Sequence, residues 1–344
     1  MDHWRHRLER HLTQAWLQRG PTAWLLLPIA LLYSAIDHLR RLAYRCGLKR
    51  SQRVGARVVV VGNVIAGGAG KTPTVIALAR DLQRLGHQVG IVSRGYGSTH
   101  AQVQEVRPDS SASSVGDEPL LMRRALNLPV FVGRDRVAAA KSLLAHYPAT
   151  SVVLCDDGLQ HLRLYRDVEV YVFDNRGVGN AWPLPAGPLR SPWPPRWVQP
   201  AGQDSSRALV LHTGNRPAFA GFCAERTLQS YGVDSTGTRF ALSELGRGAQ
   251  PCVALAGIAQ PQAFFDLLTQ QGVRVQQCIA LPDHYDFQDW QIPAIAGCAV
   301  LCTEKDAVKL WPLMPQAIAI PLEQTIEAGF YDALHAKLAS SQGS

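Results

Sequence analysis

A glycine-rich loop joins an apolar strand to a helix and carries the clearest chemistry in the sequence. The strand RVVVVG (57–62) leads to a run of glycines, and Lys71 and Thr72 open a predicted helix over 71–85. Glycines let backbone N–H groups converge on phosphate oxygens, and a helix N-terminus adds a favourable dipole. We expect Lys71 to reach the β- and γ-phosphates of a nucleoside triphosphate, and the Thr72 hydroxyl to bind Mg²⁺. The predicted cradle consists of Ile65, Ala66, Gly67, Gly68, Ala69 and Gly70.

The loop departs from the usual phosphate-binding pattern at its first position. In the pattern GxxxxGK[ST], the first glycine would fall on Ile65, so this loop is the GGxGKT variant. The alternative is a glycine-rich turn that binds nothing. The strand before the loop and the helix after it favour a nucleotide site.

Two aspartates follow another apolar strand, SVVLC (151–155). Asp156 and Asp157 therefore occupy the position at which a phosphate-loop enzyme holds Mg²⁺, directly or through water. An aspartate pair after a strand is often only turn chemistry. With the phosphate loop upstream, we predict a metal-binding or catalytic role for both carboxylates.

Strands that alternate with helices must position these groups. Apolar strands are predicted at 57–62, 88–93, 129–132, 151–155 and 168–173, with helices at 71–85, 118–126 and 135–146 between them. Strands that are apolar on both faces are typical of a parallel sheet covered on both sides. The predicted fold class is α/β, with a phosphate-loop NTPase-like parallel sheet, helices on both faces and a second, smaller α/β lobe.

We predict three consecutive parts of the chain. Residues 1–50 form a basic and apolar helical segment, 51–200 the phosphate-loop core, and 201–344 the second lobe. Seven prolines between 183 and 200 exclude a regular element there, so that stretch is either a linker or a rigid active-site loop. The second lobe has predicted strands at 208–212, 252–257, 273–281 and 299–303 and helices at 261–271 and 325–339.

The excess positive charge of the chain lies at its N-terminus. The 344 residues include 35 Lys and Arg and 27 Asp and Glu, a formal net charge of +8. Eleven of these basic and three of these acidic residues fall in 1–57, so that segment carries the whole excess. A nucleic-acid-binding domain would carry its positive charge on the folded domain itself. We therefore predict no nucleic-acid partner, and an N-terminal segment that meets an anionic surface.

An apolar run, WLLLPIALLYSAI (24–36), lies inside this basic segment. As a helix it spans about 20 Å, less than the roughly 30 Å hydrocarbon core of a bilayer. Trp16, Trp24 and Tyr33 are typical of a helix at a membrane interface, with basic residues toward anionic headgroups. The alternative is a helix packed on the protein's own core. We predict membrane association, and leave open whether the helix spans the bilayer or lies on it.

Seven short motifs, in this order, resemble those of the tetraacyldisaccharide 4'-kinase family, bacterial enzymes of lipid A biosynthesis. The resemblance covers nearly the whole chain. The motifs are GNVIAGGAGKTP (62–73), SRGYG (93–97), VGDEP (115–119), DDGLQH (156–161), GNAWPLPAGPLR (179–190), PDHY (282–285) and TEKDAVK (303–309).

The resemblance implies an activity and a location. The activity is transfer of the γ-phosphate of ATP to the 4'-hydroxyl of a tetraacylated glucosamine disaccharide 1-phosphate. The location is the cytoplasmic face of the bacterial inner membrane, whose anionic lipids would meet the N-terminal helix. The implied cofactors are ATP and Mg²⁺, the implied partner is the lipid disaccharide substrate, and no obligate protein partner is inferred.

The resemblance also implies roles for residues outside the phosphate loop. Asp117 is implied as the base that accepts the proton of the acceptor hydroxyl, with His284 as its hydrogen-bond partner. Asp117 also suits a helix N-cap, because Glu118-Pro119 begins a predicted helix. Arg136 and Arg190 are candidates for binding substrate phosphates. The family pattern continues after Arg190 with a glutamate, a proposed metal ligand, where this chain has Ser191; water, Ser191 Oγ or a neighbouring acid would replace it.

Two rival classes share part of this pattern. A membrane-associated switch ATPase of the partition or division type also has a GGxGKT loop, but normally carries a lysine where this chain has Ala66. A GTPase would need an NKxD-like motif, and TEKD (303–306) places its lysine one position too late. The lipid kinase is therefore the predicted function, and the switch ATPase is the alternative.

Overall fold

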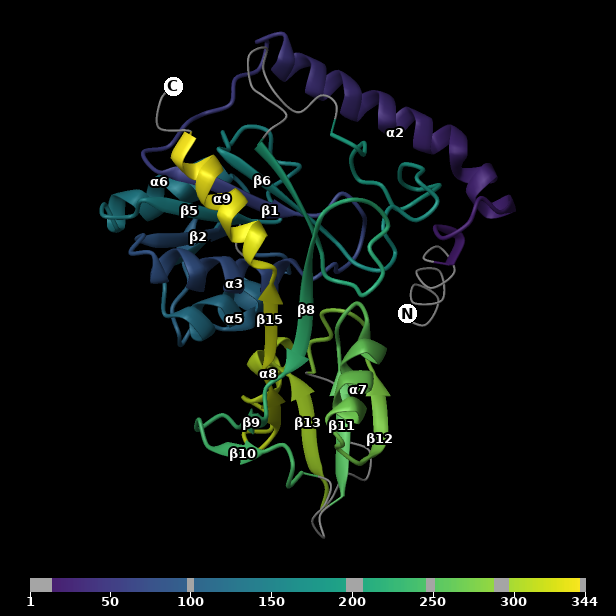
Figure 1. Ribbon diagram of the computed structural model, residues 1–344, viewed down its shortest axis with the longest axis vertical. Helices are drawn as coiled ribbons and strands as arrows, with labels where there is room; N and C mark the ends of the chain where they lie inside the picture. Colours follow the sequence, from purple (N-terminus) through teal and green to yellow (C-terminus); the bar gives the residue numbers. More distant parts are fainter. Residues whose placement is uncertain (1–13, 98–101, 196–206, 246–250, 288–296, 341–344) are drawn as a thin grey trace. The chain divides into compact units, whose positions relative to one another are not determined.

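The computed structural model describes residues 14–97, 102–195, 207–245, 251–287 and 297–340. In it the chain forms two units, each assembled from discontinuous segments (Figure 1). Unit 1 comprises Met1–Arg94, Asp135–Glu225 and Ile326–Ser344, and unit 2 comprises Gly95–Arg134 and Arg226–Thr325.

This division differs from the three consecutive parts that we predicted. The predicted boundaries at residues 50 and 200 both fall inside unit 1, and residues 95–134 belong to unit 2. The chain also passes between the units within two strands, β8 (Phe222–Leu228) and β15 (Leu322–Ile326). Local composition cannot show that the chain leaves a unit and later returns to it, because this depends on which distant segments pack together.

Unit 1 contains a parallel sheet with the neighbour order β8-β7-β6-β1-β5-β2. Almost every residue of β1, β2, β5 and β6 is buried, as expected for a parallel sheet covered on both faces. The predicted α/β phosphate-loop fold is confirmed. Besides β8, its strands are β1 (Arg57–Gly62), β2 (Val89–Ser93), β5 (Val152–Asp156), β6 (Val168–Phe173) and β7 (Ala208–His212).

The order of these strands places the predicted site. β1 lies between β5 and β6, and Val61 pairs with Asp156 near the carboxyl ends of β1 and β5. Ligands of open α/β sheets bind outside the carboxyl ends of the strands. The loop after β1 and the acidic pair at the end of β5 therefore meet at the carboxyl ends of the strands.

Three helices pack against this sheet: α3 (Lys71–Arg84), α6 (Arg136–His146) and α9 (Ala328–Ser340). The buried face of α3 carries Val75, Leu78, Ala79 and Leu82, at the spacing of one helical face. The side chain of Asp135 caps α6 by accepting hydrogen bonds from the N–H groups of Val137 and Ala138. The predicted closing helix starts later than expected, because β15 occupies residues that we had assigned to it.

The N-terminal helix α2 (Pro21–Arg45) is longer than the apolar run within it (purple in Figure 1). Its 25 residues span about 37 Å, so by length and composition it is able to cross a membrane. Only 11% of its most apolar window is buried, which does not support the alternative of a helix packed in the core. Leu25, Leu32 and Leu39 are 80%, 64% and 63% exposed.

Unit 2 is the second, smaller α/β lobe. Its six-stranded sheet has the order β10-β9-β14-β13-β11-β12, with parallel pairing from β14 to β12 and antiparallel pairing at β9 and β10. The strands are β9 (Tyr231–Val233), β10 (Arg239–Ala241), β11 (Cys252–Ala256), β12 (Val275–Ala280), β13 (Ala299–Thr303) and β14 (Ile318–Ile320).

The residues before Arg134 add two short strands and two helices to unit 2, namely β3 (Gln104–Glu105), β4 (Val130–Val132), α4 (Ala112–Val115) and α5 (Asp117–Leu126). The later part of the unit adds α7 (Pro261–Gln270) and α8 (Glu304–Leu310). Helices α5 and α8 pack against each other. This packing joins the VGDEP and TEKDAVK motifs, which are far apart in the sequence.

Candidate active site

The loop between β1 and α3 has the backbone of a phosphate cradle. Gly67 and Gly70 have φ values of +92° and +85°, which residues with a side chain adopt only with strain. Gly70 is the N-cap of α3, so Lys71 and Thr72 lie in the first turn of the helix as predicted. The N–H groups of this turn have no partner within the helix and suit an anion.

Backbone pairing explains why the first loop position tolerates a residue other than glycine. Ile65 is fully buried and forms a β-bridge with Leu189, and the Ala66 N–H donates to the Pro188 carbonyl at 2.8 Å. The Arg190 N–H donates in turn to the Val64 carbonyl at 2.7 Å. The described part of the proline-rich stretch is therefore a loop that lines the phosphate site, not a linker.

The two aspartates at the end of β5 differ in their surroundings. Asp156 is 1% exposed and accepts a hydrogen bond from Ser93 Oγ at 3.1 Å. Asp157 is more accessible and has a φ of +46°. Its Oδ1 lies 3.8 Å from Lys71 Nζ, so the acidic pair and the phosphate-loop lysine share one site.

Two arginines surround Asp157. Arg190 Nη2 donates to Asp157 Oδ1 at 2.7 Å, and Arg136 Nη2 donates to the Asp157 carbonyl at 3.2 Å. Gln160 joins this group, because its Oε1 accepts from Arg190 Nη2 at 2.9 Å. Both predicted phosphate-binding arginines thus lie beside the acidic pair, and a guanidinium group suits the binding of a phosphate.

Ser191 is engaged by an arginine of α2. Its Oγ accepts a hydrogen bond from Arg41 Nη2 at 2.9 Å and a longer one from Gln160 Nε2 at 3.4 Å. Arg41 is 6% exposed and also pairs with Asp37 at 2.7 Å. The Ser191 hydroxyl, one of the predicted replacements for the family's glutamate, therefore accepts from a buried guanidinium.

Ser191→Ala is expected to lower the free energy of unfolding by about 1–2 kcal/mol, because the buried Arg41 guanidinium loses one acceptor. The Mg²⁺ concentration for half-maximal rate should stay unchanged. Urea unfolding and a Mg²⁺ titration of turnover measure the two effects. A raised Mg²⁺ requirement at unchanged stability would instead assign Ser191 to the metal.

A histidine and an aspartate meet within unit 2. His284 Nδ1 lies 2.9 Å from Asp117 Oδ2 and 3.1 Å from Asp117 Oδ1, although 167 positions separate the two residues. The N-cap of α5 is Gly116, and within the described residues the backbone N–H that donates to the Asp117 carboxylate is that of Glu118, at 2.9 Å, which is not a helix-capping contact. This geometry favours the pair with His284 over the helix-cap interpretation.

Two lysines of α8 complete this group. Lys309 Nζ lies 3.2 Å from Asp117 Oδ2, and Lys305 Nζ lies 3.3 Å from His284 Nε2. An ammonium group has no acceptor, so Nε2 must accept from Lys305. The hydrogen of the neutral imidazole is then on Nδ1, which donates to Asp117. The α5–α8 packing thus sets the tautomer of His284.

The same neighbours control the charge of Asp117. Burial favours the neutral acid, but the hydrogen bond from His284 and the charges of Lys305 and Lys309 outweigh it and hold the pKa of Asp117 well below its usual range. The pKa of Lys305 is raised in spite of burial, because the carboxylates of Glu118, Asp117 and Asp283 surround it. Asp117 is therefore ionised and Lys305 charged at neutral pH.

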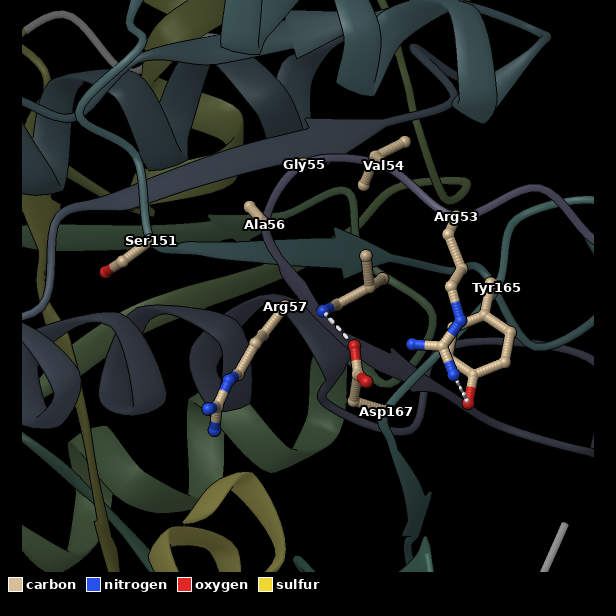
Figure 2. Close-up of a pocket in the computed structure, with 9 residues that line it drawn as sticks. Arg53, Val54, Gly55, Ala56, Arg57, Ser151, Tyr165 and Asp167 are labelled. Carbon is tan, nitrogen blue, oxygen red and sulfur yellow. Dashed lines mark hydrogen bonds between the residues drawn. The ribbon is translucent and has the colours of Figure 1, made fainter. Parts of the chain in front are cut away.

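A pocket of about 470 Å³ opens at the other end of β1 (Figure 2). Its wall includes Arg53, whose guanidinium lies 3.7 Å from the centre of the Tyr165 ring, and Asp167, which accepts from the Val58 N–H at 2.8 Å. It lies where β1 begins, whereas the phosphate loop follows the end of β1. The pocket is therefore separate from the phosphate site.

Sequence reasoning did not single out four polar residues of these two groups. They lie inside motifs that we quoted for the family resemblance, so those motifs were the available signal. The residues are Ser93, Gln160, Lys305 and Lys309.

Comparison with known proteins identifies the family. The family model for tetraacyldisaccharide-1-P 4'-kinase matches residues 22–339. A tetraacyldisaccharide 4'-kinase of Polaromonas naphthalenivorans is 51% identical over 331 residues, covering 95% of this chain and 94% of that protein. The enzyme of the same name from Acidovorax ebreus is 49% identical over 339 residues, covering 98% of this chain and 97% of that protein.

A solved structure is similar over most of the chain. The crystal structure of LpxK from Aquifex aeolicus in complex with ATP has a TM-score of 0.75 and 26% sequence identity, covering 92% of this chain and 99% of that one. These matches confirm the predicted lipid A 4'-kinase, and the switch ATPase is not supported. The chain belongs to the tetraacyldisaccharide-1-phosphate 4'-kinase family.

Proposed function

We propose that this kinase transfers the γ-phosphate of ATP to the 4'-hydroxyl of a tetraacylated glucosamine disaccharide 1-phosphate. The observation that carries the proposal is the meeting of the phosphate loop and the acidic pair, with Lys71 Nζ 3.8 Å from Asp157 Oδ1. Phosphoryl transfer needs positioning and charge stabilisation more than covalent chemistry, and this site supplies both.

The phosphate loop and the start of α3 would bind the nucleotide. The backbone from Ile65 to Gly70 would hold the phosphates through its N–H groups. Lys71 would neutralise charge on the β- and γ-phosphates, and it is held close to the site by Asp157. Arg136 and Arg190 would add positive charge at substrate phosphates, since both contact Asp157 in the same unit.

The residues present fit Mg²⁺. This ion prefers oxygen ligands and keeps several of its waters, so one or two protein oxygens suffice beside nucleotide phosphates. The Thr72 hydroxyl and the carboxylates of Asp156 and Asp157 supply those oxygens. In the ranges that the structure describes, no group of three or more His, Cys, Asp or Glu side chains could hold a metal alone, which fits an ion shared with the nucleotide. When bound, Mg²⁺ would neutralise phosphate charge.

Asp117 and His284 would act on the hydroxyl group that accepts the phosphate. We assign Asp117 as the base that takes the proton of the 4'-hydroxyl, with His284 Nδ1–H holding its carboxylate in orientation. Because nearby cations weaken Asp117 as a base, proton transfer becomes favourable only as the attacking oxygen bonds to phosphorus and loses basicity. Lys305 and Lys309 keep the carboxylate ionised until that point.

The exposed apolar face of α2 supports the proposed membrane association; the proposed location is the cytoplasmic face of the inner membrane. Leu25, Leu32 and Leu39 lie seven positions apart on one side of the helix and are largely exposed. The opposite side carries the buried Arg41, whose Nη2 donates to Ser191 Oγ at 2.9 Å. Tyr33, between the two sides, donates from Oη to the Arg190 carbonyl at 2.8 Å. Basic residues at the end of α2 would meet anionic headgroups.

Replacing Leu25, Leu32 and Leu39 together by aspartate should reduce binding to vesicles with anionic lipid by about 100-fold or more, since three exposed leucines lose their burial in the bilayer. Point substitutions are preferable to deletion of α2, because deletion would also remove the contacts of Tyr33 and Arg41 with the site. Vesicle sedimentation measures the effect.

The matched control is Leu85→Asp with Leu313→Asp, two exposed leucines outside α2, which should bind vesicles as the unchanged protein does. Unchanged sedimentation of the triple variant would remove α2 as the anchor.

Incubation of the purified protein with γ-labelled ATP, Mg²⁺ and a panel of acylated glucosamine disaccharides tests the proposed activity. Label should enter the extracted lipid only when the 4'-hydroxyl is free, and a disaccharide blocked at that position is the control. Release of labelled inorganic phosphate without labelled lipid would contradict a lipid kinase and favour a switch ATPase.

A further inference from the structure

Four consecutive carbonyl groups of the phosphate loop, those of residues 66–69, each accept a hydrogen bond from a side chain. All donors belong to unit 1, and they follow three different strands. Two of these strands, β6 and β7, lie on the side of β1 opposite to the acidic pair. The three donor residues are Asn63, Arg176 and Thr213.

Arg176 bridges two of the carbonyls. Its Nη1 donates to Ala66 at 3.3 Å and its Nη2 to Gly68 at 3.0 Å. The guanidinium is fixed from behind by the buried Asp174, with Nη2 to Oδ2 at 2.7 Å and Nε to Oδ2 at 3.0 Å. It lies so close to the loop that a Cβ on Gly67 would be 3.1 Å from Nη1. The absence of a side chain at Gly67 thus leaves room for the guanidinium to pack closely against the loop.

Asn63 and Thr213 hold the two remaining carbonyls. Asn63 is fully buried, and its Nδ2 donates to the Gly67 carbonyl at 2.8 Å. Thr213, 8% exposed, donates from Oγ1 to the Ala69 carbonyl at 2.9 Å. The Thr213 N–H also bonds the Phe173 carbonyl at 2.7 Å, which ties this residue to the end of β6. Both donors therefore start from positions that the sheet makes rigid.

These bonds determine the direction of the loop N–H groups. In a planar trans peptide the C=O and the following N–H point in opposite directions. When the carbonyls of 66–69 are held toward the three side chains, the N–H groups of 67–70 point away from them. Convergent N–H groups are what a phosphate cradle requires. Without such restraints, a loop with three glycines has many other conformations available, and ordering it on binding would lower affinity.

We propose that Asn63, Arg176 and Thr213 are positioning residues that hold the phosphate loop in its nucleotide-binding conformation before the nucleotide arrives. The inference rests on the proposed function, because it assumes that this loop binds nucleotide phosphates. It assigns Arg176 to the back of the loop, through carbonyl groups, and not to the γ-phosphate. Loss of a restraint should therefore weaken ATP and ADP equally, since both place a β-phosphate in the cradle.

Titration calorimetry of ADP and of a non-hydrolysable ATP analogue against the full chain, without lipid, tests the proposal. Thr213→Val should weaken both nucleotides by about 3- to 10-fold, and Thr213→Ser, which keeps the hydroxyl, should restore binding. Arg176→Lys keeps the charge but loses the fork that reaches two carbonyls, so we expect a loss of about 10- to 100-fold for both nucleotides. Arg207→Lys is the matched control, because Arg207 donates to Tyr165 and not to the loop.

Four outcomes would overturn the proposal. A much larger loss for the ATP analogue than for ADP would place Arg176 at the γ-phosphate. Lower melting temperatures with unchanged nucleotide affinities would reduce the three residues to a structural role. Failure of the unchanged protein to bind either nucleotide would remove the proposed function as well, whereas normal binding by all variants would remove this inference alone.

Discussion

Asp117→Asn is expected to lower turnover by about 10²–10⁴-fold while ATP affinity stays nearly unchanged. The amide keeps an oxygen that can accept the hydrogen bond from His284 Nδ1, but it cannot take the proton of the acceptor hydroxyl. Asp117 is 5% exposed, and its neighbours within unit 2 are His284 and two lysines. None of these belongs to the phosphate loop, so we expect the substitution to affect the acceptor hydroxyl and not ATP binding. Steady-state kinetics and nucleotide titration on one preparation measure both quantities.

His284→Ala provides the companion measurement. If Asp117 and His284 act as one unit, the double variant should lose less activity than the product of the two single losses. Thermal melting of each variant controls for unfolding. Turnover close to that of the unchanged protein in Asp117→Asn would remove the base assignment and leave only a structural role at the start of α5.

Lys71→Ala should lower turnover by about 10²–10³-fold and also weaken ATP binding. The ammonium group is expected to neutralise charge that grows on the phosphates during transfer, and no other lysine of unit 1 is paired with Asp157 in the described residues. The contact of Asp157 with Arg190, 2.7 Å, does not depend on Lys71, so the fold around the site should persist. Turnover as a function of ATP concentration gives both effects.

Lys141→Ala is the control for the loss of a positive charge. This exposed lysine of α6 contacts Gln52 and lies outside the phosphate site, so its removal should change neither constant. A Lys71→Ala protein with unchanged turnover at saturating ATP would show that the lysine only binds nucleotide and does not act in the transfer step.

Much of unit 1 could be predicted because its signals are local. Strands such as VVVV (58–61) are buried on both faces, and their apolar runs report this directly. Glycines at 67 and 70 indicate a loop with positive φ angles, which the structure has at both positions. The helix after the loop begins at Lys71, as predicted. The apolar run at 24–36 and the basic residues on both sides of it likewise indicated the helix α2.

The elements that were missed lack such signals. Strand β8 alternates polar and apolar residues weakly, and β9, β10 and β14 are three residues long. Their pairing with distant strands decides that they are extended. Residues 322–326 resemble a continuation toward the closing helix, but pairing in the sheet makes them β15.

The residues of the candidate site also fall into those that local sequence indicates and those that only packing brings together. Residue types within one short segment, such as Lys71 and Thr72 beside glycines, already indicate their chemistry, because the backbone between them permits few arrangements. Asp117 and His284 were connected only through the family resemblance, since no local rule joins positions 167 apart. The packing of α5 on α8 decides that pair, and with it the tautomer of His284.

The amino-acid sequence thus specified the kind of reaction: a nucleotide phosphate loop, two acidic residues and a basic apolar helix for a membrane surface. Tertiary structure decided which side chains hold the phosphate loop in place and which charged groups surround the site. Arg176, which follows β6, donates to carbonyl groups of the phosphate loop, and Arg41 of α2 donates to Ser191 Oγ. The physical reason is that a hydrogen bond depends on distance and direction between atoms, and for residues on different elements only the packing of those elements sets both.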